Sequence, residues 1–289
     1  MKKFRRGVGL LVATGLVALL VSALLSGCFL WDGLRGGTEK PGEDKPPVNP
    51  VPGEDRVTVT LFFADSQAQY VIPEEREVVK GNATLEELII QGLIDGPTSP
   101  GLGPTLPPGT RLLSVEVKEG VAYVNFSQEI QTRHAGGSAG EGMTIMSAVF
   151  SLTELPYVKA VQFMVEGKRV ETLTGHADFT EPIGRGPIRT YPVFIDKNRV
   201  EALQRLVDQG RETWRLDPLE VARREGRMAA FYLSDRFELL SRVDKGEYSG
   251  TGEADVRAVH SGKSYILKLI QPIKTGPGGI WVINSIRPE

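Results

Sequence analysis

The clearest pattern of apolar and polar positions in this chain lies in residues 106–126, LPPGTRLLSVEVKEGVAYVNF. Apolar and polar residues alternate in two short runs, Leu112–Val117 and Val121–Phe126, which flank Glu119-Gly120. Alternation of period two on both sides of a two-residue, Gly-containing gap predicts a β-hairpin. The register that sets apolar residues opposite one another pairs Val117 with Ala122, Val115 with Val124, and Leu113 with Phe126.

The other face of this hairpin carries a more polar set of side chains: Ser114, Glu116, Lys118, Val121, Tyr123 and Asn125. A two-stranded hairpin is at best marginally stable in water, so it needs a larger sheet and covering helices. No residue in it is an obvious catalyst. We therefore expect the apolar face to be core, and the second face to be either covered by another element or open to a partner.

Strand and helix signals around the hairpin predict an α+β domain over residues 57–186. Pro73 makes the second strand an edge strand, and Thr84 with Glu87 forms a capping box at a helix start. The element order predicts two helices on one face of a mixed sheet. The strands are Val57–Ala64, Tyr70–Val79, Val158–Val165 and, after a turn at Gly167-Lys168, Arg169–Leu173; the helices are Leu85–Ile94 and Met143–Leu155.

Residues 187–289 predict a second, small α+β domain, with helices first and an antiparallel sheet afterwards. Asp217-Pro218 is typical of a helix start, with Asp as N-cap and Glu220 closing the box. The turn Ser261-Gly262 pairs Ala258 with Tyr265 and Val256 with Leu267. This outline resembles cystatin-like or NTF2-like layouts, an analogy of fold alone. The elements are the helix Asn198–Asp208 and, after Arg236–Val243, the strands Gly252–His260, Lys263–Gln271 and Gly279–Arg287.

The N-terminus has the layout of a secretory signal. Residues 1–6 are basic, residues 7–25 are apolar and uncharged, and small residues follow. Leu25-Ser26-Gly27-Cys28 resembles the lipobox of bacterial lipoproteins, which predicts a signal peptide over residues 1–27 and a diacylglyceryl thioether, an acyl (palmitate-type) anchor, on Cys28. The apolar run is also long enough to be a retained transmembrane anchor. The Pro- and Gly-rich residues that follow, up to residue 56, predict a disordered tether.

Charge and cysteine content narrow the classes of function. The formal net charge is −2, and without the basic signal the remainder holds 30 basic and 36 acidic residues, which argues against a nucleic-acid binder. The single cysteine excludes an intramolecular disulfide and a zinc site built on several thiolates. His134, His176 and His260 are too scattered for a metal spacing. We expect no cofactor and no metal.

Two motifs invite a chemical interpretation. Gly136–Gly140, GGSAG, fits the G-x-S-x-G nucleophile pattern with Ser138, but Gln128–Ala135 separates it from the preceding strand, whereas a nucleophile elbow follows a strand directly. The same loop could bind an anion at a helix N-terminus, although Glu141 would repel a phosphate. Aromatic residues of the second domain could line a ligand pocket, with core packing the simpler interpretation: Trp214, Trp281 and Tyr265.

A family resemblance follows from the succession of segments between residues 57 and 184: VTVTLFFA, the strand near residues 71–76, LIIQGLIDGP, LPPGTRLLSVEVKEGVAYVNFS, SLTELPYVKAVQFMVEGKRV and ETLTGHADFTEPI. This succession resembles the GerM domain of a spore-germination and sporulation protein, which also occurs in LpqB-type lipoproteins. The resemblance implies a compact exported α/β module, related to ring-building motifs of sporulation channels, with no established catalytic residues.

The expected function is therefore a non-enzymatic lipoprotein on the outer face of the cytoplasmic membrane. It would bind other envelope or sporulation proteins and take part in sporulation, germination or the cell envelope. Two alternatives remain from other classes. One is an envelope hydrolase, or its accessory, using the Gly136–Gly140 loop. The other is binding of a small ligand by the C-terminal domain.

Overall fold

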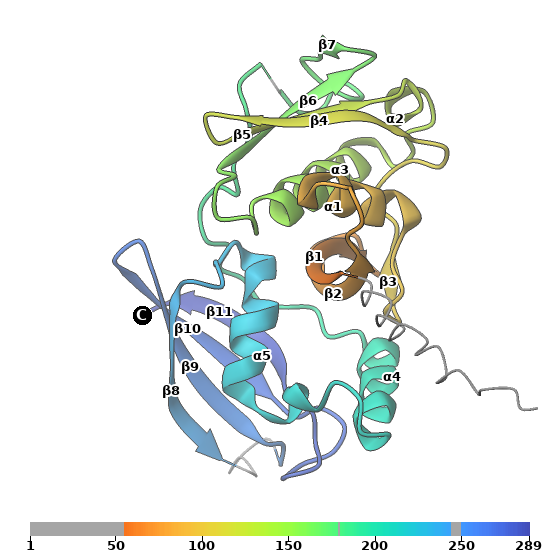
Figure 1. Cartoon of the computed structure of the whole chain (residues 1–289). Coiled ribbons are helices and arrows are strands. Elements are labelled where there is room, and N and C mark those ends of the chain that lie inside the picture. The colour runs from red at the N-terminus through yellow and green to blue at the C-terminus, as the bar shows by residue number, and fades with distance from the viewer. Residues whose placement is uncertain (1–54, 179, 244–249) are drawn as a thin grey trace, which may run out of the picture. The chain divides into compact units, whose positions relative to one another are not determined.

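The computed structural model describes residues 55–178, 180–243 and 250–289, which belong to one compact unit, Val51–Glu289. The α+β class is confirmed, with three sheets and few helices among these residues (Figure 1). We refer to residues 57–186 as the N-terminal half and residues 187–289 as the C-terminal half. The predicted domain boundary between them stays a prediction. Most buried apolar residues of the two halves belong to one continuous cluster, and a smaller second cluster lies within the C-terminal half, formed by Val200, Leu203, Val207, Ile280 and Val282.

The strands of the N-terminal half are divided between two sheets, where the element order had predicted a single one. The sheet β2-β1-β3 is built from β1 (Arg56–Asp65), β2 (Val71–Val79) and β3 (Leu102–Gly103). The second sheet has the order β4-β5-β6-β7 and is mixed, because β5 and β6 run parallel. Its strands are β4 (Leu112–Lys118), β5 (Val121–Phe126), β6 (Ala160–Val165) and β7 (Lys168–Arg169).

Two helices, α1 (Leu85–Asp95) and α3 (Gly137–Leu152), lie between β1 and the second sheet (Figure 1), and the short α2 (Glu129–Thr132) precedes α3. The predicted capping box is present, since Thr84 accepts from the Glu87 amide and Glu87 accepts from the Thr84 amide. Helix α3 starts at Gly137, earlier than the predicted Met143, so the glycine-rich segment forms its first turns.

The predicted hairpin register holds near the turn and fails at the open end. Val117 pairs with Ala122 and Val115 with Val124, and Glu119 and Gly120 both have the positive φ of a type I′ turn. The register shifts at Leu113, so Leu112 pairs with Phe126 and Leu113 is 44% exposed. A bulge inserts one residue and turns the following side chains over, which sequence alternation alone does not reveal.

The second face of the hairpin is open. Ser114, Glu116 and Lys118 are exposed, while Val121, Tyr123 and Asn125 are half-buried. The Arg169 guanidinium of β7 lies 5.4 Å from the centre of the Tyr123 ring. This face is therefore a polar surface of the molecule and carries no assembled chemical site.

Strand β1 has a free edge that α3 occupies. β1 pairs with β2 along its length but with β3 only at Ala64 and Asp65. The Phe62 amide donates to the Ser151 hydroxyl (3.0 Å), and the Ser147 hydroxyl donates to the Phe62 carbonyl (2.5 Å). Buried backbone groups need partners. Two hydroxyls spaced one helical turn apart thus replace a neighbouring strand.

The C-terminal half places its helices before an antiparallel sheet of order β11-β10-β9-β8, as predicted. The predicted pairs Ala258–Tyr265 and Val256–Leu267 are present. Asp217 caps its helix by accepting from the Leu219 amide, but Glu220 pairs with Arg224 and does not close the box. The elements are α4 (Lys197–Asp208), η1 (Thr213–Leu216), α5 (Pro218–Glu225), η2 (Gly226–Ala229), β8 (Arg236–Val243), β9 (Glu253–His260), β10 (Lys263–Ile270) and β11 (Val282–Pro288).

Replacing Ser151 with Ala leaves the buried Phe62 amide without its partner. We expect the free energy of unfolding to fall by about 1–3 kcal/mol, measured by chemical denaturation of the full chain. Ser138→Ala is the matched control, because Ser138 is an exposed serine of the same helix. Equal stability of the two variants would contradict the role assigned to Ser151.

Candidate functional site

The most elaborate polar arrangement lies where the two halves meet, around the buried guanidinium of Arg185. Its side chain is 1% exposed. It donates to the Phe150 carbonyl at the end of α3, the Phe231 carbonyl of the C-terminal half and the Thr153 hydroxyl, each at 2.7 Å, and it pairs with Glu154. One cation therefore bonds to backbone groups of both halves.

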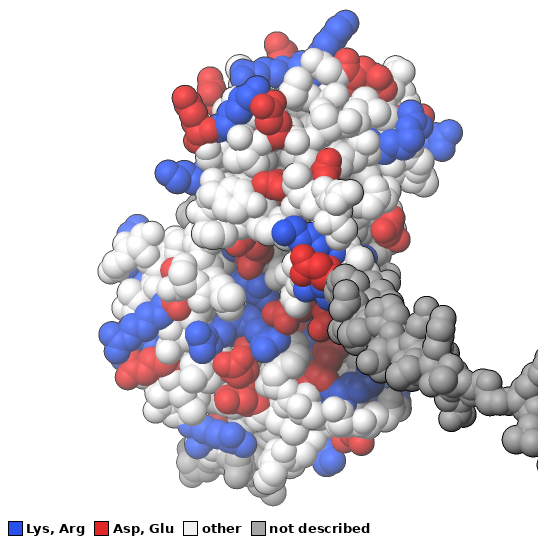
Figure 2. All heavy atoms as spheres, viewed as in Figure 1, with Lys and Arg blue, Asp and Glu red and all other residues white. Residues whose placement is uncertain are grey.

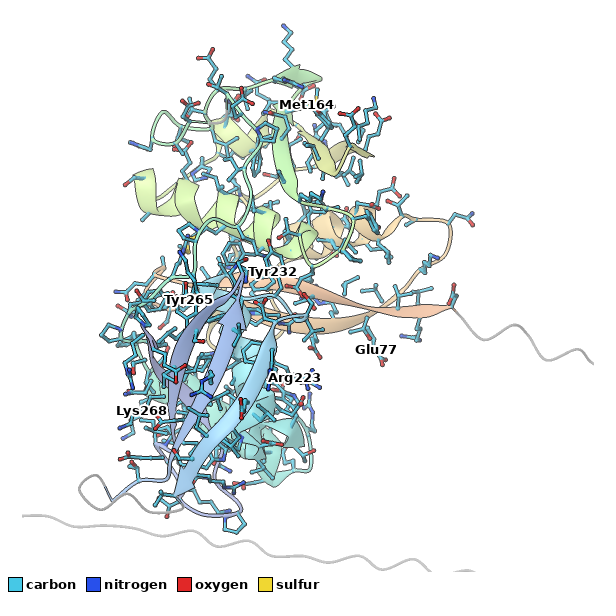
Figure 3. All side chains as sticks on the ribbon, turned by 90° about the vertical axis from the view of Figure 1, so that its left-hand side faces the viewer. Glu77, Met164, Arg223, Tyr232, Tyr265 and Lys268 are labelled. Atoms are coloured by element: carbon cyan, nitrogen blue, oxygen red, sulfur yellow. The ribbon has the colours of Figure 1, made fainter. Side chains whose placement is uncertain are left out.

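Aromatic rings enclose the same guanidinium. The ring of Tyr232 lies 4.6 Å from it and that of Phe150 5.1 Å. Tyr232 in turn stacks on His260, whose Nδ1 is 3.0 Å from Asp235. Figure 3 shows Tyr232 at the junction, near the end of the C-terminal sheet that faces α3. Because each nitrogen of the Arg185 guanidinium has a hydrogen-bond partner, this cluster stabilises the junction of the two halves.

A second buried arginine continues the junction. Arg227 is 2% exposed and pairs with Glu154 at 2.8 Å and Glu75 at 3.2 Å. It also donates to the Thr60 hydroxyl of β1 (3.2 Å). Glu154 is thus shared between Arg185 and Arg227. Buried charges are tolerated when they are paired and hydrogen-bonded, as these are.

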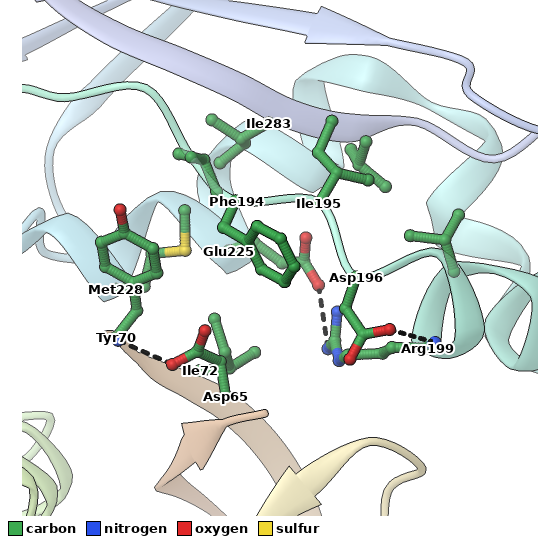
Figure 4. Close-up of a pocket in the computed structure, with 13 residues that line it drawn as sticks. Asp65, Tyr70, Ile72, Phe194, Ile195, Asp196, Arg199, Glu225, Met228 and Ile283 are labelled. Atoms are coloured by element: carbon green, nitrogen blue, oxygen red, sulfur yellow. Dashed lines mark hydrogen bonds and ion pairs between the residues drawn. The ribbon is translucent and has the colours of Figure 1, made fainter. Parts of the chain in front are cut away.

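A small cavity lies beside a third charged cluster (Figure 4). Glu225 is bonded by Arg215 at 2.7 Å and pairs with Arg199 at 3.5 Å. Burial opposes ionisation of Glu225, yet the two arginines hold its pKa below the usual value. Arg199 Nε and Asp65 Oδ2 are enclosed without a protein partner among the described residues.

The volume of this cavity decides what it can hold. It measures about 40 Å³, between apolar side chains such as Ile72, Phe194 and Ile283. A buried water needs roughly 10–15 Å³ by this measure, so there is room for up to about three waters. Those waters would supply the partners that Arg199 and Asp65 lack. The cavity has room for water and is too small for an organic ligand.

The core of the C-terminal half is filled. Trp281 is fully buried, and Tyr265 packs edge-on against Phe231. Both residues are therefore core, the simpler of the two interpretations that the sequence allowed. Trp214 differs from them, because it is half-buried and lines an open cleft.

The nucleophile elbow is not formed at Ser138. This serine is exposed in the first turn of α3, and the preceding element is α2 where an elbow needs a strand. Among the described residues, no hydrogen bond joins Ser138 to a histidine. His134 Nε2 instead meets the Thr144 hydroxyl at 3.0 Å.

The glycine-rich segment carries an anion of its own. Glu141, fully buried in α3, accepts from the Leu173, Thr174 and His176 amides and from the Thr172 and Thr174 hydroxyls. Burial alone would raise the pKa of this carboxyl, but these hydrogen bonds outweigh it and lower the pKa to about 2. Because residues 172–176 wrap around Glu141, the predicted return strand Arg169–Leu173 shortens to Lys168–Arg169.

An open polar cleft runs between the halves, and sequence patterns gave no sign of it. Two adjoining cavities, of about 320 and 510 Å³, share Glu75, Ser99 and Glu212. One wall is β2 with the segment after α1; the other is α4, η1 and α5. The lining arginines are Arg205, Arg211, Arg215, Arg224 and Arg227.

The part of the chain that the structure describes contains no group of three His, Cys, Asp or Glu residues placed to hold a metal ion. It also contains no helix long and apolar enough to cross a membrane. The predicted signal peptide, tether and lipid attachment at Cys28 lie outside the described residues and stay predictions.

Comparison with known families gives one match. The Germane family model, described as sporulation and spore germination, matches residues 60–171. The match lies within the N-terminal half and covers less than half of the chain. The matched residues run from β1 to just beyond β7, so the matched region contains both sheets, α1 and α3. This agrees with the resemblance drawn from the sequence.

Two solved structures are similar to this chain. The tandem GerMN domains of the sporulation protein GerM from Bacillus subtilis align with 19% identity and a TM-score of 0.41, covering 48% of this chain and 54% of the tandem structure. The first GerMN domain of the same protein aligns with 21% identity and a TM-score of 0.39, covering 45% of this chain and 98% of that domain. A comparison with curated proteins finds no significant match.

Glu141 should make stability depend on pH in acid. Its folded pKa of about 2 lies below the ordinary value of 4.5, so its contribution to stability is present above pH 4.5 and is lost as the pH falls towards 2. We expect a loss of roughly 3 kcal/mol over that window. Denaturation at several pH values should show this slope flattened in Glu141→Gln, while Glu116→Gln, at an exposed carboxyl, leaves it unchanged. An unchanged slope in Glu141→Gln would contradict the assignment.

Proposed function

We propose that this protein is a lipid-anchored, exported component of the cell envelope that acts by binding and not by catalysis. The observation that carries the proposal is the Germane domain together with the lipobox sequence Leu25-Ser26-Gly27-Cys28. Two acyl chains on Cys28 would hold the chain on the outer face of the membrane effectively permanently. The segment from Cys28 to Arg56 would link the anchor to the folded part.

The arrangement of buried polar groups supports a binding role. The charged clusters at Arg185, Arg227 and Glu225 are paired internally, and the carboxylate of Glu141 is fully hydrogen-bonded. The candidate nucleophile Ser138 has no base bonded to it among the described residues. What the molecule offers to partners is surface, chiefly the open hairpin face and the polar cleft. Its partners would be other envelope or sporulation proteins and the polymers around them.

The anchor can be tested by metabolic labelling with a clickable palmitate analogue. The full chain should be labelled and should fractionate with membranes, and Cys28→Ser should lose the label because the thioether cannot form. Ser26→Ala, which retains the thiol, serves as the control and should still be labelled. Persistent labelling of Cys28→Ser would overturn the anchoring part of the proposal.

A further inference from the structure

The polar cleft has an excess of positive charge once its internal ion pairs are taken into account. Glu75 is engaged by Arg224 at 2.7 Å and by Arg227 at 3.2 Å, and Glu212 is engaged by Arg215 at 2.7 Å. Figure 2 shows acidic and basic side chains gathered in the hollow of this face, between the Germane domain and the C-terminal half. The two other lining carboxylates, Glu74 and Glu225, are paired with Arg76 and with Arg215 and Arg199. Each carboxylate that lines the cleft therefore has an arginine partner.

Two arginines at the outer part of the cleft are left over. Arg205 and Arg211 are exposed and line the larger cavity, of about 510 Å³. Neither has a carboxylate within ion-pair distance among residues 55–178, 180–243 and 250–289. Their guanidinium groups present several donors in a planar fork, the geometry that binds carboxylate or phosphate oxygens. The outer cleft therefore favours an anionic ligand.

The fold explains the position of Arg205 but not that of Arg211. Arg205 lies in the last turn of α4, where a cation interacts favourably with the helix dipole. Arg211 lies beyond that helix, and its backbone amide donates to the Leu206 carbonyl, but no hydrogen bond or ion pair joins its guanidinium to the described residues. Both line one cavity together with the neutral hydrogen-bonding groups of Thr98, Ser99 and Gln209. The combination of two unpaired cations and neutral polar groups in one groove points to a ligand.

The lining also indicates the class of ligand. Protein interfaces are anchored by apolar and aromatic side chains in dry pockets, but the one aromatic ring here, Trp214, is covered by the guanidinium groups of Arg215 (4.2 Å) and Arg224 (4.9 Å). A nucleic acid would need a longer basic stripe in a less acidic chain. An open, polar groove suits a hydroxyl-rich polymer with spaced negative groups.

We propose that this cleft binds an acidic glycan of the cell envelope through Arg205 and Arg211, with carboxylate or phosphate groups of the glycan as the contacted atoms. The inference rests on the proposed function, because only an exported chain meets such polymers. The ligand class is acidic glycans, and Arg205 and Arg211 select it.

The test is co-sedimentation of the full-length protein, in detergent, with purified peptidoglycan sacculi. The cleft variant is Arg205→Gln with Arg211→Gln. The matched control is Arg236→Gln with Lys263→Gln, which removes the same two charges from exposed positions of the C-terminal sheet. We expect the cleft variant to bind at least about tenfold more weakly and the control to stay within about twofold of the original protein. Thermal unfolding confirms that both variants are folded.

Two arms identify the source of the anionic group. Sacculi that retain their phosphate polymers are compared with sacculi from which these have been extracted. Binding to both assigns the carboxylates of peptidoglycan, and binding to the first alone assigns the phosphate polymer. Absence of binding to either, or equal loss in the cleft and control variants, overturns the inference. Labelling of Cys28 is measured in the same cells, so failure of glycan binding with intact labelling leaves the anchoring proposal standing.

Discussion

The buried guanidinium of Arg185 couples the two halves of the structure. It lies at the end of the N-terminal half, bonds to the last turn of α3 through the Phe150 carbonyl, and bonds to the C-terminal half through the Phe231 carbonyl. A buried cation that loses its partners costs several kcal/mol, so the acceptors must stay in place together. Arg185 therefore fixes the end of α3 relative to the start of the C-terminal half.

Helix α3 connects Arg185 to the rest of the N-terminal half. Its serines complete the free edge of β1, and its Glu141 organises residues 172–176. On the other side, Arg227 ties Thr60 of β1 and Glu75 of β2 to α5 and η2. The β1–β2 hairpin is thus held from both halves. The two walls of the polar cleft, one from each half, are therefore held in a fixed geometry.

Local patterns in the sequence predicted the structural features that depend on residues close together in the chain. The turn at Glu119-Gly120, the capping box at Thr84 and the pairing of Val256 with Leu267 were all evident, because turn chemistry and alternation act over a few residues. The Germane resemblance likewise came from the order of such segments. The bulge at Leu113 was missed, since Leu112 and Leu113 are both apolar and the pattern does not show which of the two faces Phe126.

Features that depend on distant residues could not be predicted. Nothing near Glu141 in the sequence shows that the amides of Leu173, Thr174 and His176 converge on it. The pattern also suggested a glycine-rich loop where a helix forms. The sequence around Arg185 gives no sign of its role, because its acceptors at residues 150 and 231 are far away in the chain. The cleft depends on which arginines are already paired, and that is settled only by the tertiary structure.

The buried arginines should make the two halves one cooperative unit. Hydrogen exchange of the full chain in increasing denaturant, followed by mass spectrometry, measures whether they unfold together. We expect the amides of Leu61–Phe63 in β1 and of Val256–Ala258 in β9 to lose protection at the same denaturant concentration, and Arg185→Lys to separate the two transitions. Loss of protection in β9 well before β1 in the original protein would contradict it.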